Sequence, residues 1–165
     1  MAATAAAIVI ATMLSAAYIF PPGSQTVENH VGAPGFNQTA MLERGDTAMG
    51  FNQSLIHHHF ITTPTGGEII IMSTNMSDSR TISEIRSHVR EIRDEFSQGN
   101  FTKPFYIHAQ NVPGTATMAS KKDLIRYSIR DMDGGASLIL STNDTGLLEA
   151  IKDFMDFQSS QHMGH

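Results

Sequence analysis

The sequence contains no cysteine among its 165 residues. This absence excludes disulfides, thiolate zinc sites, iron–sulfur clusters and cysteine nucleophiles. Basic residues are also few, since 11 Lys and Arg stand against 16 Asp and Glu for a net charge of −5, and no basic block occurs. We therefore expect no nucleic-acid partner. Any bound metal ion would be held by nitrogen, oxygen or thioether sulfur. The chain is rich in residues that supply imidazole nitrogen and thioether sulfur, with 8 histidines and 10 methionines.

The first twenty residues lack charge altogether. The apolar run from Ala2 to Phe20 ends at Pro21-Pro22-Gly23, which cannot continue a helix. An uncharged segment of about 19 residues nearly spans a bilayer, whereas Ser15-Ala16-Ala17 offers the small residues of a cleavage site. We expect residues 1–20 to be a signal anchor or a signal peptide, in contact with the membrane through residues 2–20. The remainder is then anchored outside the cytoplasm or secreted.

Residues 21–50 are rich in Pro, Gly, Asn, Ser and Thr and show no sustained periodicity. This composition predicts a linker. The domain is then expected to occupy residues 51–165, which is enough chain for a core without disulfides.

The folded part repeats one short pattern. The run GGEIIIMSTN begins at Gly66, and GGASLILSTN begins 68 positions later at Gly134. Each follows a β-rich segment, Leu55 to Thr63 in the first half and Leu124 to Met132 in the second, so we interpret each Gly-Gly as a hairpin turn. A helix start with a capping Asn, Asp or Ser comes after each run. The pattern predicts two strand–strand–helix units.

Two amphipathic helices are expected, over Ser79 to Phe96 and Thr145 to Gln161, with a further strand at Pro104 to His108. On the first helix the stripe is Ile82, Ile85, His88, Val89, Ile92 and Phe96. On the second it is Leu148, Ile151, Met155, Gln158 and His162, beside Leu147 and Phe154. The fold class is α+β, an antiparallel sheet with two helices on one face. An apolar N-terminal helix precedes it.

Strand alternation places His57 and His59 on one face and His58 on the other. In the second hairpin one alternating set is apolar and should face the core: Ile125, Tyr127 and Ile129. Subtracting 68 maps this set onto His57, His59 and Ile61. The two histidines are therefore predicted to face the core.

Two further residues converge on them in this interpretation. If Thr63 pairs with Glu68 across the turn, Met72 lies opposite His59 on the same face. His88 comes from the helix stripe, where an offset of 66 maps it onto Phe154. A buried imidazole without partners costs about 1–3 kcal/mol. A shared metal ion would satisfy several at once.

These positions predict a metal site with copper first and zinc second, because a thioether ligand favours copper. The expected ligands are His57, His59 and His88, followed by His108 and Met72. Participation of His58, His162 and His165 stays open. The alternative for His88 alone is a boundary residue whose ring reaches water or a backbone carbonyl.

The expected function is a metal carrier, a metal buffer or an accessory of a metalloenzyme. A small metal-dependent enzyme is one alternative, with Glu84 as acid or base one turn before His88, although Glu84 could equally pair with Arg80 or Arg86. Others are a non-catalytic subunit of a membrane complex and a haem protein with two axial histidines. The sequence lacks a Gly-x-Ser-x-Gly elbow, a phosphate loop and a dinucleotide fingerprint, which favours a non-enzymatic role. Homodimerisation through sheet edges is a further possibility.

One set of short motifs carries a resemblance. The run Met49-Gly50-Phe51-Asn52-Gln53, then His57-His58-His59-Phe60 and the Phe105 to His108 segment form the pattern MGF(N/D)Q…HHF…(Y/F)IH. It resembles a group of small prokaryotic proteins without an established activity, some of them labelled carbamoyltransferases by mistaken transfer. The similarity covers residues 41–162 and implies a domain extent but no mechanism.

Overall fold

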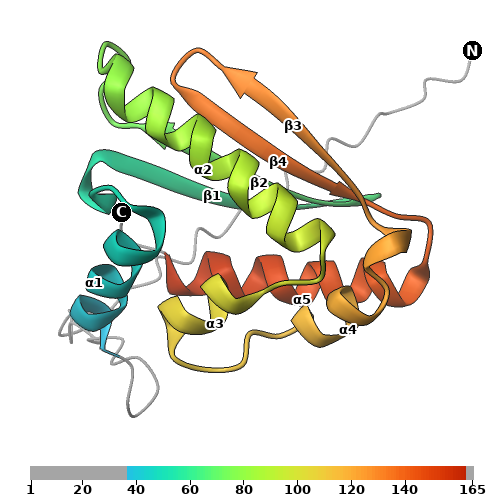
Figure 1. The fold of residues 1–165 in the computed structure, drawn as a ribbon. Coiled ribbons are helices and arrows are strands. Elements are labelled where there is room, and N and C mark those ends of the chain that lie inside the picture. Colours follow the sequence, from blue (N-terminus) through green and yellow to red (C-terminus); the bar gives the residue numbers. More distant parts are fainter. Residues whose placement is uncertain (1–36, 163–165) are drawn as a thin grey trace, which may run out of the picture. The chain divides into compact units, whose positions relative to one another are not determined.

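Four strands form one antiparallel sheet in the computed structural model, which describes residues 37–162 of the chain (Figure 1). In chain order they are β1 (Ile56–Thr63), β2 (Gly66–Ser73), β3 (Arg126–Met132) and β4 (Gly135–Ser141). Their spatial order is β1-β2-β4-β3, so two hairpins meet at the β2–β4 pair and leave β1 and β3 at the edges. The described residues belong to a unit that spans Gly35–His165.

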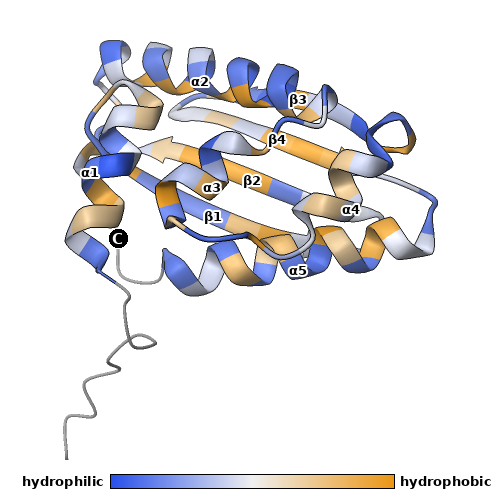
Figure 2. Ribbon diagram, turned by 60° about the horizontal axis from the view of Figure 1, so that its bottom comes forward, coloured by the Kyte–Doolittle hydropathy of each residue, from blue (hydrophilic) through white to orange (hydrophobic). Residues whose placement is uncertain are grey.

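Helices cover one face of this sheet (Figure 2). The two long ones are α2 (Ser79–Ser97) and α5 (Thr145–Gln161). α2 packs on β2, β3 and β4, and α5 packs on β1 and β2. The central contacts come from Ile69, Ile71, Ile85, Val89, Leu138, Leu140, Ile151 and Phe154. The predicted α+β class with an antiparallel sheet is confirmed. The predicted range of α5 is also correct, and α2 ends one residue later than predicted.

Each long helix begins at an aspartate that caps it. The side chain of Asp78 accepts a hydrogen bond from the Thr81 N–H at 3.1 Å, and that of Asp144 accepts one from the Leu147 N–H at 2.9 Å. These bonds satisfy amide donors that have no partner within the helix. Capping therefore defines the helix starts locally, which is why the sequence located them.

The hairpin turns differ from the prediction. Thr63 pairs with Gly66 and Met132 with Gly135, so the two-residue turns are 64–65 and 133–134. Gly66 and Gly135 open the second strands and lie 69 positions apart, not 68. A Cβ on Gly66 would lie 2.1 Å from the Leu140 carbonyl oxygen. One on Gly135 would lie 2.0 Å from that of Ile71, so glycine allows the close approach of β2 and β4 at both places.

Two segments predicted to be irregular or extended are helical. The predicted linker over 21–50 overlaps α1 (Gln38–Met49), which buries Met41 and Met49 and belongs to the folded unit. The predicted strand at Pro104 to His108 is instead α3 (Thr102–His108), whose buried residues Pro104 and His108 are one helical turn apart. The proline is tolerated because it lies in the first turn. α3 packs against α1.

Shorter elements complete the connections: η1 (Gln53–Leu55), α4 (Thr115–Ser120) and η2 (Lys122–Leu124). Within residues 37–162, no helix has both the length and the apolar character needed to cross a membrane. The apolar segment 1–20 and the remainder of the predicted linker up to residue 36 lie outside the described residues, as does His165.

Candidate functional site

The three consecutive histidines of β1 lie on two different faces of the sheet. His57 and His59 are exposed on the outer face, opposite the helices, whereas His58 is half-buried on the helix-covered face beside Ile71 of β2. The prediction that His57 and His59 face the core was therefore wrong. The cause is the offset between equivalent positions of the two hairpins, which is 69 residues and not 68. Because successive side chains of a strand alternate between its faces, an error of one residue assigns every side chain to the wrong face.

The predicted strand register was also wrong, by two residues. His57 is paired with Met72 and His59 with Ile70, so Met72 accompanies the exposed histidines on the outer face. Three of the five predicted ligands, His57, His59 and Met72, thus lie together on that face. The other two, His88 and His108, are buried on the helix-covered face. The predicted set is divided by the sheet.

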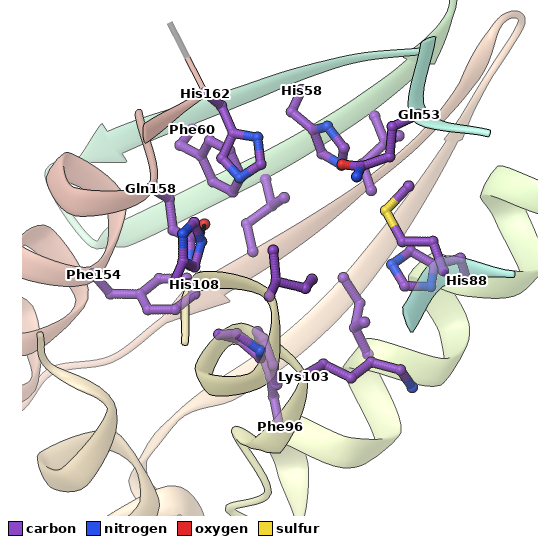
Figure 3. Close-up of a pocket in the computed structure, with 16 residues that line it drawn as sticks. Gln53, His58, Phe60, His88, Phe96, Lys103, His108, Phe154, Gln158 and His162 are labelled. Carbon is purple, nitrogen blue, oxygen red and sulfur yellow. Dashed lines mark hydrogen bonds between the residues drawn. The ribbon is translucent and has the colours of Figure 1, made fainter. Parts of the chain in front are cut away.

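A pocket on the helix-covered face contains the second group together with His58 and His162, two of the three histidines whose participation was open (Figure 3). The cavity itself is small, about 60 Å³, within about 520 Å³ of empty space that includes open solvent. The polar residues that line it are Gln53, His58, His88, Lys103, His108, Gln158 and His162. The apolar ones are Met49, Phe60, Ile69, Ile71, Ile92, Phe96, Pro104, Ile107 and Phe154. Four imidazoles therefore share one largely apolar cavity.

Three of these imidazoles pack ring against ring. The ring centres of His58 and His162 are 5.2 Å apart, and those of His108 and His162 are 5.5 Å apart. They come from β1, from the end of α3 and from the residue that follows α5. Phe60 joins the group, with its ring centre 5.4 Å from that of His162. The cluster thus depends on three segments that are distant in the sequence.

The hydrogen bond between His108 and Gln158 distinguishes the two ring nitrogens of His108. Its Nε2 lies 3.0 Å from Gln158 Oε1, and because a carbonyl oxygen only accepts, Nε2 carries the proton and Nδ1 keeps a lone pair. His108 is 6% exposed, and no described residue makes a hydrogen bond to its Nδ1. Burial lowers the pKa of His108, against the opposing effect of the Gln158 hydrogen bond. The ring is consequently a neutral acceptor at physiological pH.

His88 lies in the pocket among apolar neighbours, away from the ring cluster in Figure 3. It is 7% exposed, and the ring of Phe51 meets it edge-on with centres 6.0 Å apart. Its Nδ1 is 3.7 Å from Glu91 Oε2, beyond hydrogen-bond distance, and is unpaired among the described residues. Burial lowers the pKa of His88 to about 4, although Glu91 acts in the opposite direction. This imidazole is also neutral at physiological pH.

The single cationic side chain on the pocket lining is held by carboxylates. Lys103 Nζ lies 2.7 Å from Glu91 Oε1 and 2.6 Å from Glu95 Oε1. Burial lowers the pKa of Lys103, but these two partners outweigh it and leave the pKa raised. One ammonium between two carboxylates gives this edge of the pocket a net negative charge.

The segment Met49 to Gln53 forms one wall of the pocket. Gly50 ends α1 at φ 77°, a left-handed conformation that glycine adopts without strain, and turns the chain toward η1. Gln53 is buried and donates a hydrogen bond from Nε2 to the Leu42 carbonyl at 2.9 Å. A Cβ on Gly45 would lie 1.7 Å from that Nε2. The helix therefore needs glycine at this point for Gln53 to reach its position.

Five polar residues of the pocket lining were not among the predicted ligands. His58 was assigned to the opposite face and His162 was left open, whereas Gln53, Lys103 and Gln158 were not considered as site residues. Gln158 is buried at 4% exposure on the apolar stripe of α5, which is the signal that could have identified it. Glu84, the predicted acid or base of the enzyme alternative, forms an ion pair with Arg80 at 3.0 Å. It does not line the pocket.

In the described part of the chain, no three histidine or acidic side chains are positioned as they stand to hold a metal ion. No protein-family model matches the chain. Comparisons with curated proteins and with solved structures find no significant match either.

Proposed function

We propose that this protein binds a single copper or zinc ion at His58, His108 and His162. The observation that carries the proposal is the ring-to-ring packing of three imidazoles from three separate segments. Within this cluster His108 is buried and its Nδ1 has no hydrogen-bond partner among the described residues, which costs about 1–3 kcal/mol. An ion that accepts electron pairs from all three rings offsets that cost.

The ring spacing is compatible with a shared ion. A histidine nitrogen binds zinc at about 2.0–2.1 Å, which puts the ring centre about 3.2 Å from the ion. Two rings on one tetrahedral ion then have centres about 5 Å apart. The separations of 5.2 and 5.5 Å are close to this value. Binding requires that the rings turn until one nitrogen of each faces a common centre, and His58 and His162 are half-buried at the cluster.

Of the three histidines, His108 has the surroundings most typical of a metal ligand. Its Nε2–H donates a hydrogen bond to Gln158 Oε1, and its Nδ1 has no hydrogen-bond partner among the described residues, so the Nδ1 lone pair is available to an ion. Metal-binding histidines commonly have such an outer partner, which fixes the tautomer and the orientation of the ring. The lowered pKa of His108 keeps that lone pair unprotonated at neutral pH.

The identity of the ion is less constrained than the ligand set. The preference for copper depended on Met72, which lies on the outer face with His57. Copper and zinc therefore stay as candidates, because neutral imidazole suits both. We further propose, from the apolar segment 1–20 alone, that the domain acts outside the cytoplasm as a carrier, a buffer or an accessory of a metalloenzyme.

Metal titration of the purified full chain tests the proposal. After treatment with a chelator, the protein is titrated with Zn²⁺ and with Cu²⁺ by calorimetry, and the bound metal is counted by elemental analysis. We expect one ion per chain and at least about 100-fold weaker binding in His58→Ala/His108→Ala, because two ligands are lost. Cobalt substitution adds a spectroscopic measure, since a tetrahedral ion gives intense visible bands.

The matched control is His57→Ala/His59→Ala, which also removes two imidazoles from β1 but on the outer face. This variant should keep the full affinity and the cobalt spectrum. Absence of bound metal in the wild-type protein, or loss of binding in the outer-face variant, contradicts the pocket assignment. Binding of haem with two histidine ligands, visible in its absorption spectrum, would favour that alternative instead.

A further inference from the structure

The two edges of the sheet differ in character. β1 and β3 are the outer strands, and among the described residues each pairs with a single neighbouring strand (Figure 2). β3 carries Arg126, Arg130 and Asp131, and the guanidinium of Arg90 on α2 lies 2.7 Å from the Asp131 carboxylate. Charged side chains on an edge strand oppose pairing with another chain. The β3 edge is therefore protected.

The β1 edge has none of this protection. Its eight residues, IHHHFITT, include no Asp, Glu, Lys, Arg or Pro, and they pair with β2 in a continuous register without a bulge. An uncharged, uninterrupted edge strand is a template for pairing with one more strand. The two edges thus predict association through β1 and not through β3.

The hairpin turn determines which backbone groups of β1 are available for such pairing. Thr63 and Gly66 flank a two-residue turn and form a hydrogen-bonded pair, and such pairs alternate along an antiparallel ladder. The odd-numbered residues of β1 therefore bond to β2, and the 2.8 Å bond from the Thr74 N–H to the Leu55 carbonyl continues this alternation. The even-numbered residues direct their backbone groups away from β2. No described residue forms a hydrogen bond with the backbone of Phe60.

The same alternation limits how a second copy of the chain can pair with this edge. Residues opposite each other across two strands have side chains on the same face, so an even-numbered residue must meet an even-numbered one. A two-fold symmetric pair of β1 strands engages the largest number of them when His59 lies on the axis. Phe60 is then opposite His58 of the second copy, and Thr62 is opposite Ile56 of the second copy.

From this geometry we propose that two copies of the chain pair through their β1 strands, antiparallel and with His59 at the two-fold axis. β1 is complementary to itself in this arrangement, because the strand has no charged side chain that would meet a like charge. On the helix-covered face, Phe60 of the second copy lies beside His58 and adds an aromatic side chain at the edge of the pocket. The association does not rest on the proposed function, because the main chain makes its contacts.

Single cysteines test this arrangement, since the chain has no cysteine of its own. His59 bonds to β2, so across the axis the two copies of position 59 form a non-hydrogen-bonded pair, with Cα atoms about 4.5 Å apart. Disulfides form at Cα separations of about 4.4–6.8 Å. The full chain with His59→Cys, treated with oxidised glutathione in the presence of a chelator, should therefore give a covalent dimer on a non-reducing gel.

His57→Cys and Ile61→Cys are the matched controls, because both residues are exposed on the same face of the same strand. In the proposed dimer each lies four residues along the strand from its own copy, about 14 Å away and too far for a disulfide. Each variant alone should cross-link at least about tenfold more slowly than His59→Cys. An equimolar mixture of the two should cross-link, because position 57 faces position 61 of the second copy.

The rates of the three single variants decide the outcome. Failure of His59→Cys to cross-link, or similar rates for all three, overturns the proposal. Similar rates are expected if the chains meet only by random collision or through the apolar segment 1–20. Faster cross-linking of His57→Cys or Ile61→Cys than of His59→Cys excludes the proposed register. The chelator removes cross-linking through a bound ion, so the result is independent of the metal titration.

Discussion

The two faces of β1 carry the same residue type in opposite environments. On the outer face, His57 and His59 are exposed, and His57 has Met72 as its cross-strand neighbour. On the helix-covered face, His58 meets the ring of His162, which in turn meets His108. Adjacent residues on one strand thus belong to two sites, one open to water and one inside a cavity.

The difference shows that burial, and not proximity in the sequence, determines whether an imidazole stays neutral and can serve as a ligand or a hydrogen-bond acceptor. Inside the pocket, desolvation lowers the pKa of His88 and His108 and keeps their rings neutral. Such rings are available as ligands or hydrogen-bond acceptors without competition from protons. The predictions that follow test this contrast, beginning with the largest expected effect.

Acid should destabilise the protein through the buried imidazoles of the pocket. His88 has a pKa of about 4 when folded and 6.5 when exposed, so between these values the unfolded chain takes up a proton that the folded chain excludes. The free energy of unfolding therefore falls as the pH is lowered from 6.5 to 4, by roughly 3 kcal/mol. Urea denaturation at a series of pH values measures this loss.

His88→Leu should remove most of that pH dependence, and the remainder should come largely from His108, whose pKa is lowered in the same direction. The outer-face variant His57→Leu serves as the control and should keep the wild-type slope. If His88→Leu retained the full loss of stability in acid, the neutral state of His88 in the folded protein would be disproved.

Replacement of Gln158 should disturb His108 alone. In Gln158→Leu the Nε2–H of His108 loses its partner inside the protein, which costs about 1–3 kcal/mol of unfolding free energy. Metal affinity should fall by about 10–100-fold, since the ring loses the contact that orients it. Gln110→Leu, at an exposed glutamine, should change neither value. A Gln158→Leu protein with unchanged affinity would exclude the supporting role.

Chemical modification should distinguish the two faces directly. Diethyl pyrocarbonate reacts with unprotonated imidazole, and the exposed rings of His57 and His59 should react about tenfold faster or more than His88 and His108. The buried rings react only when the structure opens locally. Mass spectrometry of peptides from a time course gives the individual rates, and equal rates on both faces would contradict the assigned burial.

The smallest effect is expected from Phe51, whose ring covers His88 edge-on. Phe51→Ala should cost about 1 kcal/mol for the lost aromatic contact. It should also raise the pKa of His88 toward its ordinary value, because water reaches the ring. Titration of the His88 ring protons by NMR measures the change. A pKa that stayed at about 4 would show that other residues alone desolvate this imidazole.

Sequence patterns located most of the secondary structure and part of the site. The stripe of α2, including His88 and Phe96, is buried as its helical spacing predicted. The Asp144 cap and the range of α5 also followed from local signals. The segment Pro104 to His108 did not, because its aromatic and branched residues favour a strand in isolation, whereas packing of α3 against α1 stabilises a helix.

For the candidate site, the sequence predicted the residue type, histidine, but not which histidines come together. Histidines were expected beside the core, and two of the five predicted ligands, His88 and His108, do line the pocket. The other three were assigned to the wrong face through a one-residue error in the hairpin offset. The two Gly-Gly runs resemble each other most closely at an offset of 68 residues, and this similarity was the stronger sequence signal. The hairpin turns, which define the strand register, are 69 residues apart.

The sequence by itself determined the two capped amphipathic helices and the two hairpins. It also determined that no thiol can serve as a metal ligand, because the chain has no cysteine. These properties arise from local spacing, capping and composition, which do not depend on the rest of the molecule. Only the tertiary structure decided which histidine of β1 enters the pocket, because successive residues of a strand alternate between faces and a single step in register exchanges them. It likewise brought His58, His108 and His162 together, since those contacts exist only when β1, α3 and α5 are packed.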